Sequence, residues 1–486
     1  MANLRANWRV KWTKAALALI CSCSGDPVVG PNTGPEAVAA VDGDANTVAT
    51  PDTAAAPDVA QETAAVDADG GVDDAPVVTV ADAVADAIAA ATDATATDAA
   101  QAATADTAQS DADAGSPAKP DLYDPEYLPK FELVVDAAAL AVLMDPSEAT
   151  KKQWVHAAFT CEGETLADVG LRRKGESTYR VIPQKAAFKV KFDKWEKGLK
   201  FRGLSELTLN NMVDDATALR ERLAFAVYAA LKLPAPKCNT ALVTLNGEAY
   251  GPYANIETPN SQFLKAKFGA NANTLYEADW GSAWLPGDQD GMQVDVGVAA
   301  KADLVKLFEA VAAASNAKLL ADVQKYLDVK QWLAFCAAEA VLAEHDNYAY
   351  GVWGSHNYFM AGGADGKFRL VPWSVDLSLT DDDGGVDAAQ PRPADPSDGG
   401  DTLLMRCHKT PQCWDTYKQA VAEVLTSYVA ADLVKLATKW HAQIDAYQVA
   451  DDKRECSLDY YQSSWLKLLA WMPARPGVVS KQLGLP

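Results

Sequence analysis

The feature that most restricts the fold of this chain is a long N-terminal stretch without aromatic residues. No Phe, Trp or Tyr lies between Trp12 and Tyr123, and Ala, Asp, Thr and Val dominate. Residues 27–119 carry 17 acidic side chains and one basic one. Repelling charges without large apolar groups do not offset the entropy cost of ordering a backbone. We therefore expect residues 27–122 to form a disordered acidic linker, or a transient Ala-rich helix within it, and residues 123–486 to fold.

The net charge of −23 belongs mostly to this linker. Residues 27–119 account for −16, and the 367 residues after them carry −10, which is ordinary for a soluble domain. Nucleic-acid binding requires a basic surface that neutralises phosphates. The composition therefore argues against a nucleic-acid partner.

Residues 1–26 have the composition of an export signal. Basic residues precede the apolar run AALALI, which is too short to span a bilayer as a stable helix. The stretch resembles a bacterial lipoprotein signal, in which a Cys that follows a small residue is lipidated. Cys23 follows the small Ser22, whereas Cys21 follows Ile20. The resemblance implies an exported envelope lipoprotein, held at the outer membrane or cell surface by a lipid on Cys23. A cytosolic N-terminus is the alternative.

Six cysteines follow the signal, and we expect one pair of them to be bonded. Cys407 and Cys413 flank HKTPQ, and a Pro-containing turn would bring the two thiols together. Cys336 lies in the apolar run WLAFCAAEAVLA and is expected in the core. The cysteine spacings do not suggest a zinc site.

Apolar and polar residues follow strand periodicity first and helix periodicity later. Phe188 and Val190 alternate with lysines, which predicts a half-buried strand. The dipeptide Asn246-Gly247 predicts the turn of a β-hairpin. The helices are expected at 137–144, within ATALRERLAFAVYAALKL, at 303–315 and 329–344, and in three C-terminal segments. This order predicts one α+β domain of two lobes with a helical C-terminal part.

The segment 344–376 concentrates the polar residues that a phosphoryl-transfer site needs. It reads EHDNYAYGVWGSHNYFMAGGADGKFRLVPWSVD and contains Asp346, Asn357 and Asp376 in that order. Such a site uses one carboxylate to orient the attacking hydroxyl, and an amide oxygen with a second carboxylate for metal-bound phosphates. Asp and Asn also occur widely in turns, so a purely structural role is the alternative.

The folded part resembles the CotH kinase family, named for the spore coat protein H kinases. The similar stretches are VGLRRKGESTY, QKAAFKVKF, LTLNNMVDDATALRERLA, LPAPK, VTLNGEAYGPYANIETPNSQFLK, TLYEAD, EHDNYAYGVWGSHNYFM, LVPWSVD and LAWMPARPGVVSKQLG. The resemblance implies an atypical protein-kinase-like fold. It also implies ATP-dependent phosphorylation of protein hydroxyls, often at cell or spore surfaces.

The resemblance assigns roles to the residues of the polar segment. Asp346 matches the catalytic aspartate, which orients the substrate hydroxyl and takes its proton. Asn357 and Asp376 match the ligands of Mg²⁺ or Mn²⁺. One position departs from the family: Ser374 stands where the first aspartate of a Trp-Asp-x-Asp motif is expected. A serine offers an oxygen without charge, so metal affinity should fall if the missing carboxylate was a ligand.

The nucleotide-binding residues are expected among the lysines and arginines of the first strands. Lys185 and Lys189 have the same parity along one strand and would point to one face. Lys185 fits the family motif better, and its predicted partner is Glu221 on the following helix. Arg173, in the run RRKG, would belong to a phosphate-facing turn. The alternative for these side chains is simple solvation.

Two functions follow from the sequence. The first is an exported, lipid-anchored kinase that transfers phosphate from ATP to Ser or Thr hydroxyls of surface proteins. The alternative is a catalytically inactive surface adhesin or scaffold on the same fold, in which Ser374 records lost catalysis.

Overall fold

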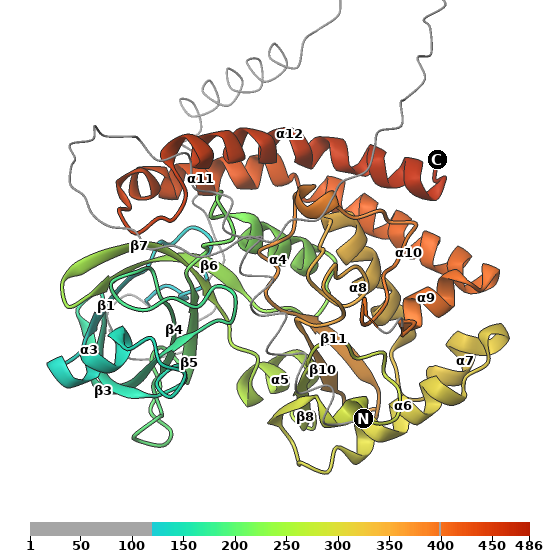
Figure 1. Cartoon of the computed structure of the whole chain (residues 1–486), viewed down its shortest axis with the longest axis horizontal. Helices are drawn as coiled ribbons and strands as arrows, with labels where there is room; N and C mark the ends of the chain where they lie inside the picture. Colours follow the sequence, from blue (N-terminus) through green and yellow to red (C-terminus); the bar gives the residue numbers. More distant parts are fainter. Residues whose placement is uncertain (1–118, 398–399) are drawn as a thin grey trace, which may run out of the picture. The chain divides into compact units, whose positions relative to one another are not determined.

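The computed structural model describes residues 119–397 and 400–486 of the chain. The predicted signal peptide with Cys23, and all but the last residues of the predicted linker, lie outside the described residues. The described part contains helices and strands, with a closed β-barrel first and helices at its C-terminal end (Figure 1). The prediction of an α+β fold with a helical C-terminal part is therefore confirmed.

Seven strands form the barrel. They are β1 (Lys130–Val134), β2 (Val155–Cys161), β3 (Glu164–Lys174), β4 (Ala187–Lys191), β5 (Glu206–Asn210), β6 (Cys238–Leu245) and β7 (Glu248–Ile256). Their order around the barrel is β1-β2-β3-β4-β5-β7-β6. Neighbouring strands are antiparallel except for β1 and β6, whose parallel pairing closes the barrel. A closed barrel leaves no sheet edge unpaired.

Aromatic side chains fill the interior of the barrel. Phe159 lies at the centre of this cluster, with its ring centroid 5.2 Å from Phe131, 5.1 Å from Phe192 and 4.9 Å from Phe201. The last two contacts are edge-to-face, which aromatic quadrupoles favour. Because side chains alternate along a strand, polar residues of the same strands lie on the outer surface of the barrel.

A second, four-stranded antiparallel sheet follows the barrel. Its strands are β8 (Thr274–Glu277), β9 (Gln293–Val296), β10 (Tyr358–Gly362) and β11 (Phe368–Pro372). They are ordered β11-β10-β8-β9, and β10 and β11 form a hairpin with Tyr358 opposite Pro372. All five residues of β10 are buried, so this hairpin lies inside the molecule.

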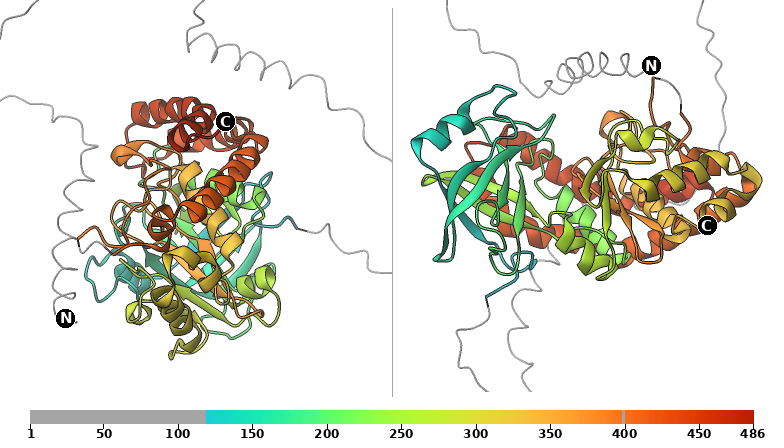
Figure 2. Two further views of the ribbon diagram at one scale, coloured as in Figure 1. Left: turned by 90° about the vertical axis from the view of Figure 1, so that its right-hand side faces the viewer. Right: turned by 90° about the horizontal axis from the view of Figure 1, so that it is seen from below.

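Helices pack against the hairpin sheet and against the barrel. The longer ones are α3 (Ala137–Met144), α4 (Arg220–Ala230), α5 (Ser261–Phe268), α6 (Ala302–Ala313), α8 (Val329–Leu342), α10 (Pro411–Ala430), α11 (Leu433–Ala450) and α12 (Leu458–Leu483). The short ones are α7 (Leu319–Val323), α9 (Leu403–His408) and the 3₁₀ turns η1 (Asp288–Asp290), η2 (Asn316–Lys318) and η3 (Asp382–Gly384). Helices α11 and α12 pack side by side in the views of Figures 1 and 2. Among the described residues, no helix is both long and apolar enough to cross a membrane.

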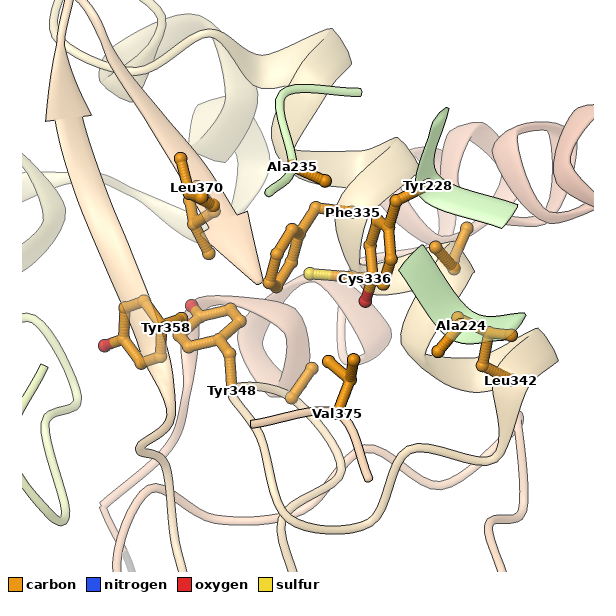
Figure 3. Packing of buried hydrophobic residues seen from close by; sticks show 14 of the residues in the cluster. Ala224, Tyr228, Ala235, Phe335, Cys336, Leu342, Tyr348, Tyr358, Leu370 and Val375 are labelled. Atoms are coloured by element: carbon orange, nitrogen blue, oxygen red, sulfur yellow. The ribbon is translucent and has the colours of Figure 1, made fainter. Parts of the chain in front are cut away.

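Helix α8 is the central element of the main hydrophobic core. It packs against α4, α10, α12 and β11. Figure 3 shows Phe335 and Cys336 of α8 among the buried side chains, and the ring of Phe335 lies 5.9 Å from that of Tyr228 on α4. Helix α4 also packs against β6 and α11, so α4 links the barrel to this core.

Several local predictions are confirmed. Helix α3 covers the predicted residues, the turn Asn246-Gly247 joins β6 to β7, and Cys407 and Cys413 form a disulfide with a Cα–Cα distance of 5.1 Å. Cys336 is buried. Helix α4 begins at Arg220, later than the pattern predicted, because the residues before it form turns held by the carboxylate of Asp215.

Arg475 of α12 provides a test of how the C-terminal helix is attached. Its buried guanidinium donates to the carbonyls of Ala340 (2.6 Å), Val341 (3.2 Å) and Val386 (3.0 Å). The first two belong to the last turn of α8, whose carbonyls lack the i+4 partners of the helix interior, and that of Ala340 also accepts from the N–H of Ala343 at 3.3 Å. We expect Arg475→Met to lower the free energy of unfolding by about 2–4 kcal/mol, because three buried acceptors lose a charged donor. Denaturant unfolding measures this loss.

Lys467→Met, at an exposed position of α12, is the control and should change the free energy of unfolding by less than about 0.5 kcal/mol. Equal effects of the two variants would contradict this role of Arg475.

Candidate functional site

Two buried carboxylates of the α8 segment fix the loop that follows it. The carboxylate of Glu339 accepts hydrogen bonds from the backbone N–H groups of Tyr348 (2.9 Å) and Ala349 (2.8 Å). The carboxylate of Glu344 accepts from the N–H of Asp346 (3.0 Å) and from the hydroxyl of Ser378. Burial raises the pKa of Glu339 to about 8, against the effect of the two N–H groups, and raises the pKa of Glu344 well above its ordinary value. The conformation of the loop at Asp346 therefore depends on these buried groups.

The carboxylate of Asp346 has two neighbours from the turn before β10. The Nε2 atom of His356 lies 2.7 Å from its Oδ1, and the Nδ2 of Asn357 donates to its Oδ2 at 2.9 Å. The Nδ1 of His356 lies 2.8 Å from the carbonyl oxygen of Gly354. Burial lowers the pKa of His356, but the charge and hydrogen bond of Asp346 outweigh burial, so the pKa is raised. The side chain of Asp346 remains 17% exposed, so a small group can reach it.

The β10–β11 hairpin brings Asn357 and Asp376 to the same end. Asn357 precedes β10, and its carbonyl oxygen accepts from the N–H of Trp373, which follows β11, at 3.1 Å. Asn357 and Ser374 have φ angles of 56° and 52°, in the left-handed region that non-glycine residues rarely adopt. Such conformations concentrate at functional sites. The hydroxyl of Ser374 donates to Oδ1 of Asp376 at 3.4 Å.

The surroundings of Asp376 carry several other carboxylates. Its side chain is buried, with the residue 8% exposed. Burial, then the charge of Asp214, and then the charges of Asp346 and Asp215 raise the pKa of Asp376 to about 7. A divalent cation would relieve this repulsion, and oxygen donors of this kind suit Mg²⁺ or Mn²⁺. The residues present therefore fit such an ion.

The ligand set is small, however. Among the described residues, no group of three or more His, Cys, Asp or Glu side chains is arranged to hold a metal ion. Mg²⁺ typically binds one or two protein carboxylates and completes its shell with water and substrate phosphates. Asp376 with the amide oxygen of Asn357 would match that mode, in which the nucleotide supplies the remaining ligands.

A second polar cluster comes from the barrel and α4. Glu221 is buried, and the Nδ2 of Asn210 donates to both of its carboxylate oxygens, at 3.1 and 2.9 Å. The ammonium group of Lys174 donates to Oδ1 of Asn210. Burial, followed by the charge of Asp376, raises the pKa of Glu221 to about 8. Burial lowers the pKa of Lys174 to about 8, opposed by the charges of Glu221 and Asp376. The two clusters are therefore close enough to act on each other electrostatically.

The predicted pair of Lys185 and Glu221 is not formed. Lys185 makes a buried ion pair with Asp451, the C-cap residue that follows α11. Parity along a strand does not apply to Lys185, because β4 begins two residues later at Ala187. Lys174 takes the position near Glu221, with Asn210 as the bridge.

Arg173 also lies away from the site. It is buried, and its guanidinium donates to the carbonyl of Asp145 (2.9 Å) and the hydroxyl of Thr150 (3.0 Å). Alternation along β3 places Arg173 on the same side as the buried Leu171, and Lys174 on the opposite side. The period of two in β3 was the signal that could have selected Lys174 from the sequence.

Lys189 does lie on the outer side of the barrel near this cluster. It is partly exposed on β4, where its neighbours Phe188 and Val190 are buried. Its charge contributes to the lowered pKa of Lys174 and acts on Glu277 of β8. Its predicted contact with nucleotide remains a prediction.

Asp214 acts on the site although no motif in the sequence singled it out. Asp215 accepts from the N–H of Arg220, the first residue of α4, at 2.7 Å. Asp214 instead exerts the largest charge effect on Asp376. Consecutive residues outside regular structure point in different directions, and no periodicity in the sequence separates them.

The sequence matches a known protein family. A family model described as CotH kinase protein matches residues 171–479, from β3 to α12. The match covers more than half of the chain. The chain belongs to the CotH family. The predicted resemblance to this family is confirmed, and the match includes Asp346, Asn357 and Asp376.

Two curated proteins of Bacillus subtilis (strain 168) are similar to this CotH family member. The inner spore coat protein H is 24% identical over 190 residues, which cover 37% of this chain and 51% of that protein. The inner spore coat protein H-like protein is 35% identical over 80 residues, covering 16% of this chain and 24% of that protein. The similarity thus spans about half of the first relative and a quarter of the second.

Glu339 gives a pH test of the buried network. Its pKa of about 8 exceeds the ordinary glutamate value of 4.5, so the folded protein keeps a proton that the unfolded chain releases between these values. The contribution of Glu339 to stability is therefore full below about pH 4.5 and is lost as the pH rises toward 8. Glu339→Gln removes this titration. We expect the unfolding free energy of wild type minus that of the variant to decrease from pH 5 to pH 8, measured by denaturant unfolding. An increase over this range would contradict the raised pKa.

Proposed function

We propose that this chain is a protein-kinase-like phosphotransferase that transfers the γ-phosphate of ATP to Ser or Thr hydroxyls of proteins. The observation that carries the proposal is the convergence of Asp346, Asn357 and Asp376 at the open end of the β10–β11 hairpin, with contacts of 2.9 Å between the first two. Membership of the CotH family supports it.

The reaction assigns each of these residues a task. The acceptor hydroxyl would donate its hydrogen to the carboxylate of Asp346 while its oxygen bonds to the γ-phosphorus and the bond to the β-phosphate oxygen breaks. His356 and Asn357 hold that carboxylate in one orientation. The carboxylate of Asp346 already interacts with His356, so it would mainly orient the acceptor hydroxyl. This role suits phosphoryl transfer through a loose transition state, in which a strong general base is not required. Mg²⁺ or Mn²⁺, held by Asp376 and Asn357, would neutralise phosphate charge.

The barrel would supply the nucleotide-binding side. Lys174 lies on the outer side of β3, and the charges of Glu221 and Asp376 both act on the pKa of its ammonium group. We propose that it contacts the phosphates, with Lys189 beside it, and that Asn210 and Glu221 hold its position. A barrel on one side and a hairpin with helices on the other would then form the two lobes of a kinase-like fold.

The second candidate function is a catalytically inactive surface adhesin or scaffold. Ser374 favours it, because this residue brings no charge to the metal site and its hydroxyl already contacts Asp376. Asp214 favours catalysis, because its carboxylate adds charge near Asp376 where Ser374 does not.

We propose a location at the cell surface or in a coat layer. The curated relatives are named inner spore coat proteins. A lipid anchor on Cys23 would attach the protein to a membrane, and the acidic residues 27–122 would separate the anchor from the kinase-like domain. The partners would be surface proteins with accessible hydroxyls, and nucleic acid is not expected as a partner.

Phosphotransfer by the purified protein tests the proposal. With labelled ATP and Mg²⁺ or Mn²⁺, we expect wild type to label itself or Ser/Thr peptides, and Asp346→Asn and Asp376→Asn to lose activity by about 100-fold or more. Asp365→Asn is the matched control, because Asp365 lies at the closed end of the same hairpin, where it pairs with Arg369. Equal incorporation by all four proteins, or none by wild type, would overturn the proposed catalysis.

The pH dependence of nucleotide binding tests Lys174. Its pKa of about 8 lies below the ordinary lysine value, so the ammonium loses its proton as the pH rises through 8. We expect the affinity of wild type for ATP to fall between pH 7 and pH 9. Lys174→Arg should bind ATP with little change over this range, because a guanidinium stays charged. Calorimetric titration measures both, and Lys152→Arg, at an exposed position, should behave as wild type. Identical pH profiles for Lys174→Arg and wild type would contradict the role of Lys174.

A further inference from the structure

The connection between α11 and α12, residues 451–457, contacts the barrel through three ion pairs. They are Lys185–Asp451, Arg180–Glu455 and Lys453–Glu248. In each pair one residue belongs to this connection, and the other belongs to β7 or to the segment between β3 and β4. Helix α12 itself packs against α8 and α10. The connection therefore joins the barrel to the helices of the main core (Figure 1).

The pair Lys185–Asp451 is built into the packing of the barrel. The two side chains are only 4% and 1% exposed. Gly251 of β7 makes room for the pair, because a Cβ atom at this position would meet the carboxylate of Asp451. Breaking a buried ion pair leaves an uncompensated charge and is strongly destabilising. This pair therefore keeps the connection against the barrel.

Arg180 lies in the segment that follows the proposed phosphate-binding residue. Residues 175–186 connect β3, which ends at Lys174, to β4. The side chain of Asn211 donates to two carbonyl oxygens of this segment, at 2.9 and 2.7 Å. The side chain of the adjacent Asn210 accepts from the ammonium group of Lys174. Consecutive residues at the end of β5 therefore hold both the segment and Lys174.

Glu455 holds Arg180 beside the turn that carries Asp214. The guanidinium of Arg180 donates to both carboxylate oxygens of Glu455, at 2.5 and 2.7 Å. Glu455 and Asp215, the neighbour of Asp214, line the same small cavity. Burial raises the pKa of Asp214, and the charge of Arg180 lowers it whereas that of Glu455 raises it. The ion pair thus lies next to the turn whose charge acts most on Asp376.

We propose that Glu455 is a positioning residue of the nucleotide site. Through Arg180 it holds segment 175–186, and with it Lys174, where phosphates and a metal ion bridge Lys174 to Asp376. The two-point contact of a guanidinium with a carboxylate fixes orientation as well as distance. This inference rests on the proposed function, because Lys174 and Asp376 have these roles only in a chain that binds ATP with a metal ion.

The exposure of the pair separates this role from a purely structural one. The side chains of Arg180 and Glu455 are 22% and 34% exposed. Solvent screens such a pair, so it contributes little to the free energy of unfolding. Its loss should therefore lower the affinity for nucleotide and leave the stability of the fold nearly unchanged.

Exchange of the two charges in the purified full-length protein tests this role. The variants are Arg180→Glu, Glu455→Arg, Glu455→Gln and the double variant Arg180→Glu/Glu455→Arg, which restores an ion pair in reversed order. Calorimetric titration with a non-hydrolysable ATP analogue and Mg²⁺ measures affinity, and denaturant unfolding measures stability. The matched control is the double variant Lys409→Asp/Asp401→Lys, which reverses a partly exposed ion pair at α9.

We expect each single variant to bind the analogue more weakly, on the order of 10-fold for the two charge reversals. The double variant should recover most of this loss, and the control should bind as wild type does. All variants should unfold with free energies within about 1 kcal/mol of wild type. Unchanged affinity in the single variants overturns the inference. A double variant as weak as Arg180→Glu also overturns it, because Arg180 would then act on the nucleotide without Glu455.

Binding and phosphotransfer distinguish a failure of this inference from a failure of the proposed function. Wild type that binds the analogue but transfers no phosphate overturns the proposed catalysis, while the charge exchange still decides whether Glu455 positions the nucleotide site. Wild type that binds no analogue overturns both.

Discussion

The candidate site depends on two carboxylates that are buried in the core. Glu339 and Glu344, in and just after α8, accept hydrogen bonds from the loop that carries Asp346. A buried carboxyl group is costly unless its oxygens have hydrogen-bond donors, and here the donors are three backbone N–H groups of the functional loop and the hydroxyl of Ser378. The loop cannot leave this conformation without exposing unpaired carboxylate oxygens to the core. The buried helix α8 therefore fixes the position of Asp346 through these hydrogen bonds.

The charges at the site are not balanced by the protein itself. Asp214, Asp215, Asp346 and Asp376 act on one another, and their mutual repulsion and burial raise the pKa of Asp376 to about 7. Lys174 offsets this charge only in part, and burial lowers its own pKa. A site with this excess of negative charge is suited to a divalent cation. A cation that also binds phosphates would bring the remaining negative charge within reach of Lys174.

Much of the fold followed from local patterns in the sequence. The helix at 137–144, the Asn246-Gly247 hairpin and the Cys407–Cys413 disulfide each depend on residues that are close in the chain. Closure of the barrel depends on the parallel pairing of β1 with β6, whose partners are more than 100 residues apart, and no local pattern encodes it.

Some positions of the candidate site residues also followed from local patterns, and others did not. Asn357 and Asp376 flank the apolar strands of one hairpin, so the hairpin itself brings them together. Asp346 lies in the loop after α8 and reaches Asn357 by a side-chain hydrogen bond. Lys185 was misplaced because the strand begins after it. Arg173 was chosen over Lys174 although the alternation of β3 places Arg173 on the same side as the apolar Leu171. The ion pair between Lys185 and Asp451 joins segments 266 residues apart, which the sequence alone does not reveal.

The central claim is that Asp376 and Asn357 hold a metal ion together with a nucleotide. Binding of Mn²⁺ to the purified protein, followed by electron paramagnetic resonance with and without a non-hydrolysable ATP analogue, tests it most directly. We expect wild type to bind Mn²⁺ at least about 10-fold more tightly when the analogue is present, because phosphate oxygens complete the coordination shell. Asp376→Asn should lose this gain. Mn²⁺ binding that is indifferent to the analogue, or equal in wild type and Asp376→Asn, would contradict it.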